Sequence, residues 1–305
     1  MNEFEEATEL ARLRLEARNE KNWQEADRLR DQIASLGFKV LDTKDGFELE
    51  AQTFTPLQSL QDLKADSIAF SNQSTVVCLV VDGWLEDTLE CLQHVLVHTS
   101  LPIALLDLSN DGDMHIELTK FANHHVNRLE VKIVEKTLSD VGWGHAFNHL
   151  IQAVKAENVI ILDVSTILDG DAFSPLVNAL RNEVVAVGWK GANIQSDWLS
   201  FESAVGEVDA LLSYLLVVKR DVFLRHPFDS KAKFYRNADL EWSLELRSQG
   251  YKLLALVDEL PCHQARHHGY HDSDEQIRNR ESKRNYDRLL SKFRGKTEIL
   301  AKRTS

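Results

Sequence analysis

The sequence predicts an α/β fold with a mostly parallel sheet flanked by helices, preceded by a small helical module. Thr75–Val81 is a continuous, largely β-branched run, which is typical of a strand buried on both faces. Strand-like and helix-like segments then alternate as far as residues 159–162, as in βαβ units. Before this region, apolar residues recur at helical spacing over residues 4–36.

The first fifty residues are expected to form a helical hairpin followed by a β-hairpin. The helical phase breaks at residues 19–22, and Asn22 with Glu25 is typical of a capping box that starts a second helix. Gly37 is the expected end of that helix. Short apolar runs on either side of a Lys-Asp-Gly turn indicate the β-hairpin. We therefore predict a module over residues 1–50, a linker with one helical turn over 51–74, and an α/β domain over 75–305.

The stretch ARNEKNWQEADRLRDQIASLGFKVLDTKDG resembles the extreme C-terminal appendage of cysteinyl-tRNA synthetases. The likeness covers about the first fifty residues, and we find no synthetase nucleotide-binding signature elsewhere in the sequence. Two interpretations stay open for the module. It is either an RNA- or partner-binding appendage or a packing cap for the next domain, and we favour the cap.

Charge is distributed unevenly along the chain. The net charge is −13, which argues against wholesale wrapping by nucleic acid. Residues 277–305 nevertheless hold ten Lys and Arg against three acidic residues, so the rest of the chain carries −20. This basic tail is predicted to be an amphipathic helix that packs back on the sheet. Peripheral contact with phosphates or an acidic membrane surface is the alternative.

The cysteines and apolar runs indicate a reduced, cytoplasmic chain. Cys78, Cys91 and Cys262 lie far apart without a C-x-x-C pair, so neither a disulfide framework nor a structural zinc site is expected. The start of the chain is acidic and shows no secretory signal. The longest apolar run has the length of a strand and predicts no transmembrane segment.

Acidic residues follow the strands of the predicted sheet. Asp82 and Gly83 follow the first strand, Asp107 ends the second, and Asp163 follows the fourth. Each residue alone is weak evidence, because acidic turn residues often only cap helices. In parallel sheets, however, ligands gather beyond the carboxyl ends of the strands. A ligand site is therefore expected at this edge.

A further segment, FDSKAKFYRNADLEWSLELRSQGY, predicts a loop that runs into a helix starting with Asp239 and Glu241. Asn237 is the expected N-cap and Gly250 the expected C-terminal glycine. The positive end of the helix dipole should favour the ionised form of Asp239. A carboxylate in this position is suited to take a proton from an incoming hydroxyl.

In order along the chain, the acidic strand ends, GWGHAFNHLIQAVKAENVIILDVS, this helix and a His-rich segment resemble the family 2 glycosyltransferases, of the GT-A fold. The resemblance covers roughly residues 75–295. It implies an inverting, hexosyltransferase-like enzyme that moves a sugar from a nucleoside diphosphate sugar to an unidentified hydroxyl acceptor. Asp239 would be its general base, although Ala238 replaces the acidic neighbour that the family usually has.

The same resemblance implies a nucleotide-sugar site at the strand ends. Asp107 would contact the nucleotide base, with Asp82 beside it. The helix opening between Gly142 and Asn148 would approach the ligand through its backbone amides. An ordinary Gly-rich helix entry is the alternative interpretation of these two residues.

The family usually holds a divalent cation on the diphosphate with an Asp-x-Asp motif after the fourth strand. Here the motif is Asp163-Val164-Ser165, so a hydroxyl replaces the second carboxylate. Hard divalent ions prefer several oxygen anions, which makes this a weaker site. One expectation is Mg²⁺ or Mn²⁺ held by Asp163 and completed by His263.

Cations of the protein could instead neutralise the diphosphate without a metal. Arg266, His267 and His268 are the candidates for this role, and Arg266 is our main choice. A zinc site is a lower-ranked alternative, because the histidine cluster lacks a thiolate and has a poorly matched spacing. That cluster comprises His263, His267, His268 and His271.

Glu241 and Trp242 are the acceptor-side candidates: Glu241 to orient the acceptor and Trp242 to stack on a sugar face. Their plainer interpretations are an exposed helix position for Glu241 and core packing for Trp242.

Two alternatives to an active enzyme remain. A degenerate transferase that only binds a nucleotide sugar or a partner would explain Ser165 and Ala238. An RNA-associated protein acting through the N-terminal module is the other, and the acidic charge argues against it.

Overall fold

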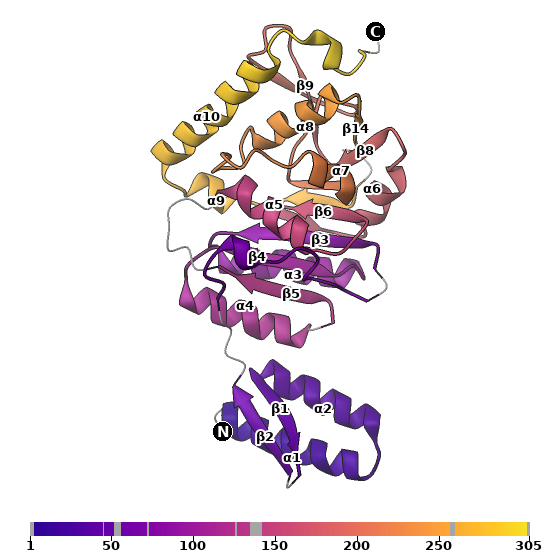
Figure 1. The fold of residues 1–305 in the computed structure, drawn as a ribbon, viewed down its shortest axis with the longest axis vertical. Helices are drawn as coiled ribbons and strands as arrows, with labels where there is room; N and C mark the ends of the chain where they lie inside the picture. The colour runs from indigo at the N-terminus through magenta and orange to yellow at the C-terminus, as the bar shows by residue number, and fades with distance from the viewer. Residues whose placement is uncertain are drawn as a thin grey trace.

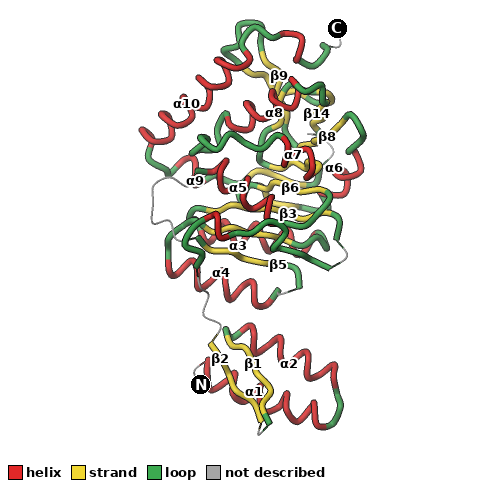
Figure 2. Tube along the Cα trace, in the orientation of Figure 1, coloured by secondary structure: helices red, strands yellow, loops and turns green. Residues whose placement is uncertain are grey.

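The computed structural model describes residues 3–44, 46–51, 56–71, 73–125, 127–134, 142–256 and 260–303. A helical pair and a β-hairpin at the N-terminal end are followed by a larger unit in which helices cover a central sheet (Figure 1). Colouring by secondary structure shows the strands of this sheet stacked between helices (Figure 2). The predicted α/β class is confirmed.

Four elements build the N-terminal module: α1 (Glu3–Asn19), α2 (Trp23–Ser35), β1 (Phe38–Thr43) and β2 (Gly46–Ala51). The Asn22 side chain accepts a hydrogen bond from the Glu25 backbone N–H at 3.3 Å, so the predicted cap of α2 is confirmed. The Glu25 carboxylate binds Arg28 instead of returning a bond to Asn22. Gly37 ends the helix at φ +81°, a left-handed backbone that favours glycine.

The module has a small core of its own, in which Ala7, Ala11 and Ile33 are fully buried. Outside this core, α2 lies next to α4 (Gly112–His124) of the larger unit (Figure 1). Such a contact is what the packing-cap interpretation expects.

The segment before the sheet is more ordered than the predicted linker. Residues 56–71 contain the single-turn helix η1 (Leu60–Asp62), as expected. They also reach the larger unit directly, because Leu57 forms a β-bridge with Val134 and Ile68 forms one with Val154. Both Leu60 and Ile68 are buried in the main apolar cluster. This segment is therefore part of the core, and its scattered apolar residues gave no periodic signal that would have revealed it.

Eight strands of the described chain form the central sheet, in the spatial order β11-β14-β8-β13-β6-β3-β4-β5. In chain order they are β3 (Thr75–Val81), β4 (Ile103–Asp107), β5 (Leu129–Ile133), β6 (Asn158–Leu162), β8 (Val184–Gly188), β11 (Gly206–Glu207), β13 (Leu215–Lys219) and β14 (Lys252–Ala255). The four strands β6, β3, β4 and β5 are parallel, as predicted. Between β6 and β8, β13 runs antiparallel, with Leu215 opposite Leu162.

Helices cover both faces of the sheet. One apolar layer joins it to α3 (Leu85–His98), α4 and α6 (Phe173–Ala179). The other joins it to α5 (Trp143–Ala153), α7 (Arg220–Arg225) and α8 (Ala238–Ser248). Helix α4 begins earlier than its apolar spacing predicts, because the Asp111 side chain caps the backbone N–H groups of Asp113 and Met114.

Smaller sheets complete the larger unit. A β-hairpin is formed by β9 (Gly191–Ile194) and β10 (Phe201–Ala204). The short strand β12 (Ala210–Leu211) pairs with the other side of β9. Next to the central sheet, β7 (Thr166–Leu168) pairs with β15 (Cys262–Gln264), which leads into the short helix α9 (His268–His271).

The basic C-terminal helix α10 (Glu275–Phe293) forms as predicted, but through Leu289 and Phe293 it packs on α8 instead of on the central sheet. Each Lys and Arg of α10 lies within 4.0 Å of a carboxylate. These ion pairs leave the helix little free charge for an acidic membrane surface. Among the described helices, none is both long and apolar enough to cross a membrane.

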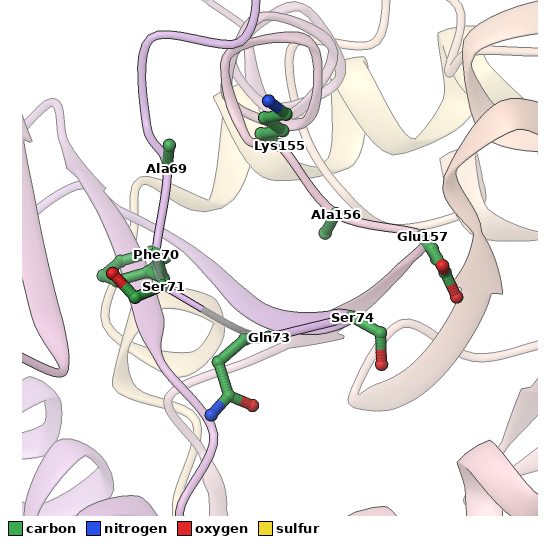
Figure 3. A pocket seen from close by; sticks show the side chains of 8 residues that line it. All are labelled: Ala69, Phe70, Ser71, Gln73, Ser74, Lys155, Ala156 and Glu157. Carbon is green, nitrogen blue, oxygen red and sulfur yellow. The ribbon is translucent and has the colours of Figure 1, made fainter.

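A hollow of about 700 Å³ opens where β3 and β6 begin (Figure 3). It is lined by Ala69, Phe70, Ser71, Gln73, Ser74, Lys155, Ala156 and Glu157. Ser74 and Glu157 directly precede the first residues of the two strands. The hollow therefore lies at the amino ends of these strands, opposite the edge at which the sequence predicts the ligand site.

Candidate functional site

Two of the predicted site residues, Asp163 and Asp239, are held by one short piece of backbone. The Asp163 N–H donates to the Tyr214 carbonyl at 3.0 Å, at the edge where β6 ends and β13 begins. The neighbouring Ser213 N–H donates to the Asp239 carboxylate, also at 3.0 Å. Successive residues thus join the strand end to the start of α8. The predicted base helix lies at the carboxyl ends of the parallel strands, where ligands of such sheets bind.

Asp239 is a buried carboxylate that is held by neutral donors. It is only 7% exposed and accepts hydrogen bonds from the Ser213 N–H, the Ser213 hydroxyl and the Leu240 N–H. No Lys or Arg forms an ion pair with it in the described part of the chain. Burial raises the pKa of Asp239 to about 6, against the lowering effect of these hydrogen bonds. The backbone N–H groups at the helix start lower this pKa, as expected from the helix dipole, but burial outweighs them.

The ends of α8 follow the prediction in position and only partly in chemistry. Asn237 occupies the N-cap position, but its backbone is left-handed, at φ +67°, and its side chain caps nothing. Instead its amide donates to the Ser282 carbonyl of α10 at 3.0 Å. Gly250 lies just beyond the helix at φ +84°, as predicted for a C-terminal glycine. Asn237 therefore fastens the start of α8 to α10.

Asp163 is bound on both oxygens. One oxygen accepts from the Ser165 N–H at 2.9 Å and from the Ser165 hydroxyl, and the other lies 3.0 Å from His267 Nε2. Burial alone would raise the pKa of Asp163, but His267 and Ser165 lower it overall. For His267 burial lowers the pKa, and the bond to Asp163 reverses this and raises it. The two side chains therefore hydrogen-bond to each other at the strand end, while His267 Nδ1 accepts from the Tyr270 N–H at 3.1 Å.

The histidine that contacts Asp163 is thus His267. The prediction that His263 lies beside Asp163 and completes a metal site with it was wrong. The pairing of β15 with β7 places His263 opposite Ile167, and its Nδ1 lies 2.7 Å from Asp169 Oδ2. Residues four positions apart in this segment reach different carboxylates because β15 ends between them. Only the strand register, which the sequence does not show, decides which histidine reaches Asp163.

The zinc alternative also fails. His268 binds Asp87 at 2.6 Å and stacks on Trp84, and His271 packs edge-on against Tyr270. The four histidines of the predicted cluster therefore point to separate partners. Within the described ranges, no three His, Cys, Asp or Glu side chains come together closely enough to hold a metal ion.

Asp163 and His267 offer one carboxylate oxygen and one imidazole nitrogen at the same point. Diphosphate oxygens and water complete the coordination of Mg²⁺ or Mn²⁺ in many sites with few protein ligands. The pair would therefore supply two ligands to a divalent ion if the ion replaced the hydrogen bond between them and His267 lost its Nε2 proton. Ser165 orients the carboxylate rather than supplying the second anion of an Asp-x-Asp motif.

Two tyrosines that the sequence analysis did not single out also belong to this site. The Tyr235 ring stacks on the His267 imidazole with ring centroids 4.9 Å apart and an interplanar angle of 18°. The Tyr214 ring lies under Lys190, whose Nζ is 4.7 Å from the ring centroid. Tyr235 stands four residues before Asp239, and this closeness to the predicted base was the signal that could have found it.

Gly142 and Asn148 contact the loop that contains residues 228–233 instead of facing a ligand. A Cβ on Gly142 would meet the Lys233 Cα at 2.7 Å, so the glycine permits close packing with residues 232 and 233. The Asn148 amide donates to the Phe228 carbonyl at 2.8 Å and accepts from the Phe228 N–H at 3.0 Å. The ligand-binding prediction for this helix is therefore corrected. Both residues fasten the loop that leads to Asp239.

Glu241 and Trp242 face away from Asp239. Glu241 is 3% exposed and binds Arg288 at 2.8 Å and Lys292 at 2.6 Å, both from α10. Trp242 is 2% exposed, and its indole N–H donates to the His226 carbonyl at 2.8 Å. The side chain that was expected to stack on a sugar is a core residue, and the carboxylate that was expected to orient the acceptor is occupied by α10.

The remaining predicted residues have different surroundings. Asp107 is fully buried and accepts from the Ser109 N–H at 2.8 Å, while its other oxygen lies 3.4 Å from His115 Nε2 without a hydrogen bond. Burial raises the pKa of Asp107. Asp82 is exposed at the end of β3. Arg266 is also exposed and pairs with Asp272 at 2.8 Å. Their ligand roles stay predictions.

Comparison with known proteins identifies the N-terminal module. A family model described as the cysteinyl-tRNA ligase anticodon binding domain matches residues 5–48. A cysteine–tRNA ligase of Azobacteroides pseudotrichonymphae is 50% identical over 48 residues, which are 15% of this chain and 10% of that protein. A cysteine–tRNA ligase of Chlamydia caviae is 63% identical over 30 residues, 10% of this chain and 6% of that protein. The chain thus spans about a tenth or less of the curated relatives it matches.

Solved structures resemble the larger unit. GalNAc-T7, crystallised with UDP, GalNAc and Mn²⁺, has a TM-score of 0.57 and 15% identity, over 72% of this chain and 48% of that chain. The mannosyltransferase PcManGT from Pyrobaculum calidifontis, in complex with GDP-Man and Mn²⁺, has a TM-score of 0.56 and 16% identity, over 76% of this chain and 67% of that chain. The chain therefore combines a module like the anticodon-binding domain of cysteinyl-tRNA ligases with the GT-A fold of glycosyltransferases.

Proposed function

We propose that this chain is a glycosyltransferase that uses a nucleoside diphosphate sugar and inverts the anomeric centre. One observation carries the proposal: Asp239 is buried without a paired cation among the described residues, and one piece of backbone links it to Asp163 at the strand ends. The GT-A fold supports it. The two structural neighbours hold UDP and GDP-Man, which makes uridine and guanosine diphosphate sugars the first donors to test.

Asp239 is the general base in this proposal. Its carboxylate takes the proton of the acceptor hydroxyl as that oxygen attacks the anomeric carbon. The bond from the anomeric carbon to the diphosphate oxygen breaks on the opposite side, and its electron pair leaves with the nucleoside diphosphate. A base with a pKa of about 6 is ionised at neutral pH and is still basic enough to share a proton in the transition state.

Asp163 and His267 act on the leaving diphosphate. When bound there, Mg²⁺ or Mn²⁺ would neutralise charge that develops on the leaving group. Without a metal, His267, whose pKa Asp163 raises, would be an alternative source of positive charge at this point. Asp107 and Asp82 remain our candidates for the nucleotide base, and Arg266 for the diphosphate.

A thermal-shift screen tests the proposal. UDP, GDP, UDP-glucose, UDP-GalNAc and GDP-mannose are each added with and without Mn²⁺, because a ligand that binds the folded state raises the melting temperature. We expect at least one sugar nucleotide to raise it, and more so with Mn²⁺. Release of nucleoside diphosphate in the presence of mixed saccharide acceptors then reports transfer. A chain that binds none of the five ligands would refute the proposal.

A degenerate transferase that only binds is the second candidate, favoured by the way Ser165 replaces a metal-binding carboxylate. It predicts binding in the same screen without release of nucleoside diphosphate under any metal. The RNA-binding alternative is favoured by the match of residues 5–48 to the cysteinyl-tRNA ligase anticodon binding domain, but the ion pairs of the module argue against it. Every arginine of the module lies within 3.4 Å of a carboxylate: Arg12, Arg14, Arg18, Arg28 and Arg30. Salt-sensitive retention of tRNA by the full chain would revive it.

A further inference from the structure

The Tyr235 hydroxyl is a buried polar group without a hydrogen-bond partner among the described residues. Folding removes such a group from water, so buried hydroxyls are nearly always paired in the working state of a protein. The ring itself is fixed, because it stacks on His267 and packs against Phe234, with centroids 4.3 Å apart. A hydroxyl on a fixed ring, unpaired and inside a candidate site, points to a partner that binds there.

Tyr235 is connected to both carboxylates of the site: its ring stacks on His267, which bonds Asp163, and its carbonyl accepts from the Ala238 N–H directly before Asp239. Burial raises the pKa of its hydroxyl, and the charges of Asp163 and Asp239 both add to the rise. Neither carboxylate accepts a hydrogen bond from the hydroxyl, which has no partner among the described residues. Asp163 is bound by Ser165 and His267, and Asp239 by Ser213 and Leu240. We infer that the hydroxyl faces the space between the Asp163 and Asp239 side chains.

The proposed reaction says what occupies that place. In a single displacement the acceptor oxygen, the anomeric carbon and the leaving oxygen lie roughly on one line. Asp239 stands at the acceptor end of that line and Asp163 at the diphosphate end. A group that faces both carboxylates therefore faces the sugar ring between them. Sugar hydroxyls supply the acceptor oxygen that Tyr235 lacks.

We propose that the Tyr235 hydroxyl donates a hydrogen bond to the sugar being transferred, and so helps to select the sugar of the donor. The inference rests on the proposed transferase function and adds a specificity residue to it. A site that hydrogen-bonds a substrate hydroxyl discriminates against analogues without it, because a buried polar group is then left unpaired.

Calorimetric titration of Tyr235→Phe tests this contact, because the substitution removes the hydroxyl and keeps the ring on His267. Each sugar nucleotide is compared with its own nucleoside diphosphate in separate titrations: UDP-glucose and UDP-GalNAc with UDP, and GDP-mannose with GDP. The variant is tested with the pair that the wild-type protein binds most tightly. We expect Kd for the sugar nucleotide to rise roughly 3- to 10-fold and Kd for the nucleoside diphosphate to stay within about twofold. A donor that lacks the contacted sugar hydroxyl should lose affinity for wild type and not for the variant.

Tyr251→Phe is the matched control. Tyr251 packs against His226 beyond the other end of α8 and outside the site, and its variant should bind both ligands as wild type does. Equal weakening of both ligands by Tyr235→Phe would overturn the inference and assign Tyr235 to the positioning of His267. No weakening of either ligand would also overturn it. If wild type binds none of these ligands, the proposed function fails together with the inference, whereas a failure of the variant alone leaves the function standing.

Discussion

Two faces of the first turn of α8 carry buried carboxylates of opposite character. Asp239 and Glu241 are almost equally buried, at 7% and 3% exposed. Glu241 lies against α10 and is bound by Arg288 and Lys292. Asp239 faces the strand ends and receives only neutral hydrogen bonds. Because burial of an ionised carboxylate costs free energy unless it is compensated, the two residues must serve different ends.

The comparison separates a structural carboxylate from a functional one. A buried acid that is paired with cations, such as Glu241, joins two helices, and its oxygens are already bound and not available to a ligand. A buried acid without them keeps a raised pKa, which is a common mark of a catalytic group. The sequence places both residues in one helical turn, and only their surroundings tell them apart.

Asp239→Asn is expected to have the largest effect. It should lower sugar transfer by about 10²- to 10⁴-fold, because the amide cannot take the proton of the acceptor. Binding of the sugar nucleotide should stay within about twofold of wild type. The native pKa of about 6 lies above that of an unfolded aspartate, so ionisation costs native stability as pH rises through this range. The free energy of unfolding at pH 7 should therefore not fall, and transfer at the wild-type rate would break the comparison.

Glu241→Gln should produce the opposite pattern. Removing the charge leaves Arg288 and Lys292 with Asp229 as their remaining shared carboxylate, and the free energy of unfolding should fall by about 2–4 kcal/mol. Sugar transfer per folded molecule should be unchanged at a temperature well below the melting point. Denaturant unfolding and a transfer assay on the same sample measure both quantities. A variant that is stable and inactive would return Glu241 to the acceptor side.

Asn148→Ala tests the same distinction between structural and functional residues at a position on α5, away from α8. The variant loses both hydrogen bonds to the backbone of Phe228, and the free energy of unfolding should fall by about 1–3 kcal/mol. The affinity for nucleoside diphosphate should be nearly unchanged in the folded protein. Selective loss of nucleotide affinity, with stability preserved, would show that Asn148 contacts the ligand after all.

Asp287→Asn provides the smallest expected change. Asp287 pairs with Lys283 on the outer side of α10, where the two side chains are 56% and 72% exposed. Water screens such a pair, so the free energy of unfolding should change by less than about 0.5 kcal/mol. A loss comparable to that of Glu241→Gln would mean that burial does not explain the difference between these carboxylates.

Local signals in the sequence were enough to predict the sheet and its helices. Thr75–Val81 and the helical spacing around it appear as predicted, because buried strands and amphipathic helices have their own periodicity. The strand-end acids Asp107 and Asp163 and the base candidate Asp239 also lie on the predicted elements. Their ligand roles remain proposals.

Contacts between distant segments could not be predicted in the same way. Which histidine reaches Asp163 depends on the register of β15 with β7. Which acid of α8 faces the site depends on the position of α10, more than forty residues later. Asn148 matched a motif by type, but its amide is used by the backbone of Phe228. Pairings of this kind follow from tertiary packing and leave no period in the sequence.

The pH dependence of sugar transfer by the wild-type protein tests the central claim most directly. If Asp239 must be ionised to act as the base, kcat/KM should rise about tenfold per pH unit below pH 6 and level off above it. The midpoint of this limb should lie near pH 6, well above the ordinary pKa of an aspartate. A rate that is constant from pH 5 to pH 7.5, or a limb with its midpoint near 4, would contradict a buried Asp239 as the base.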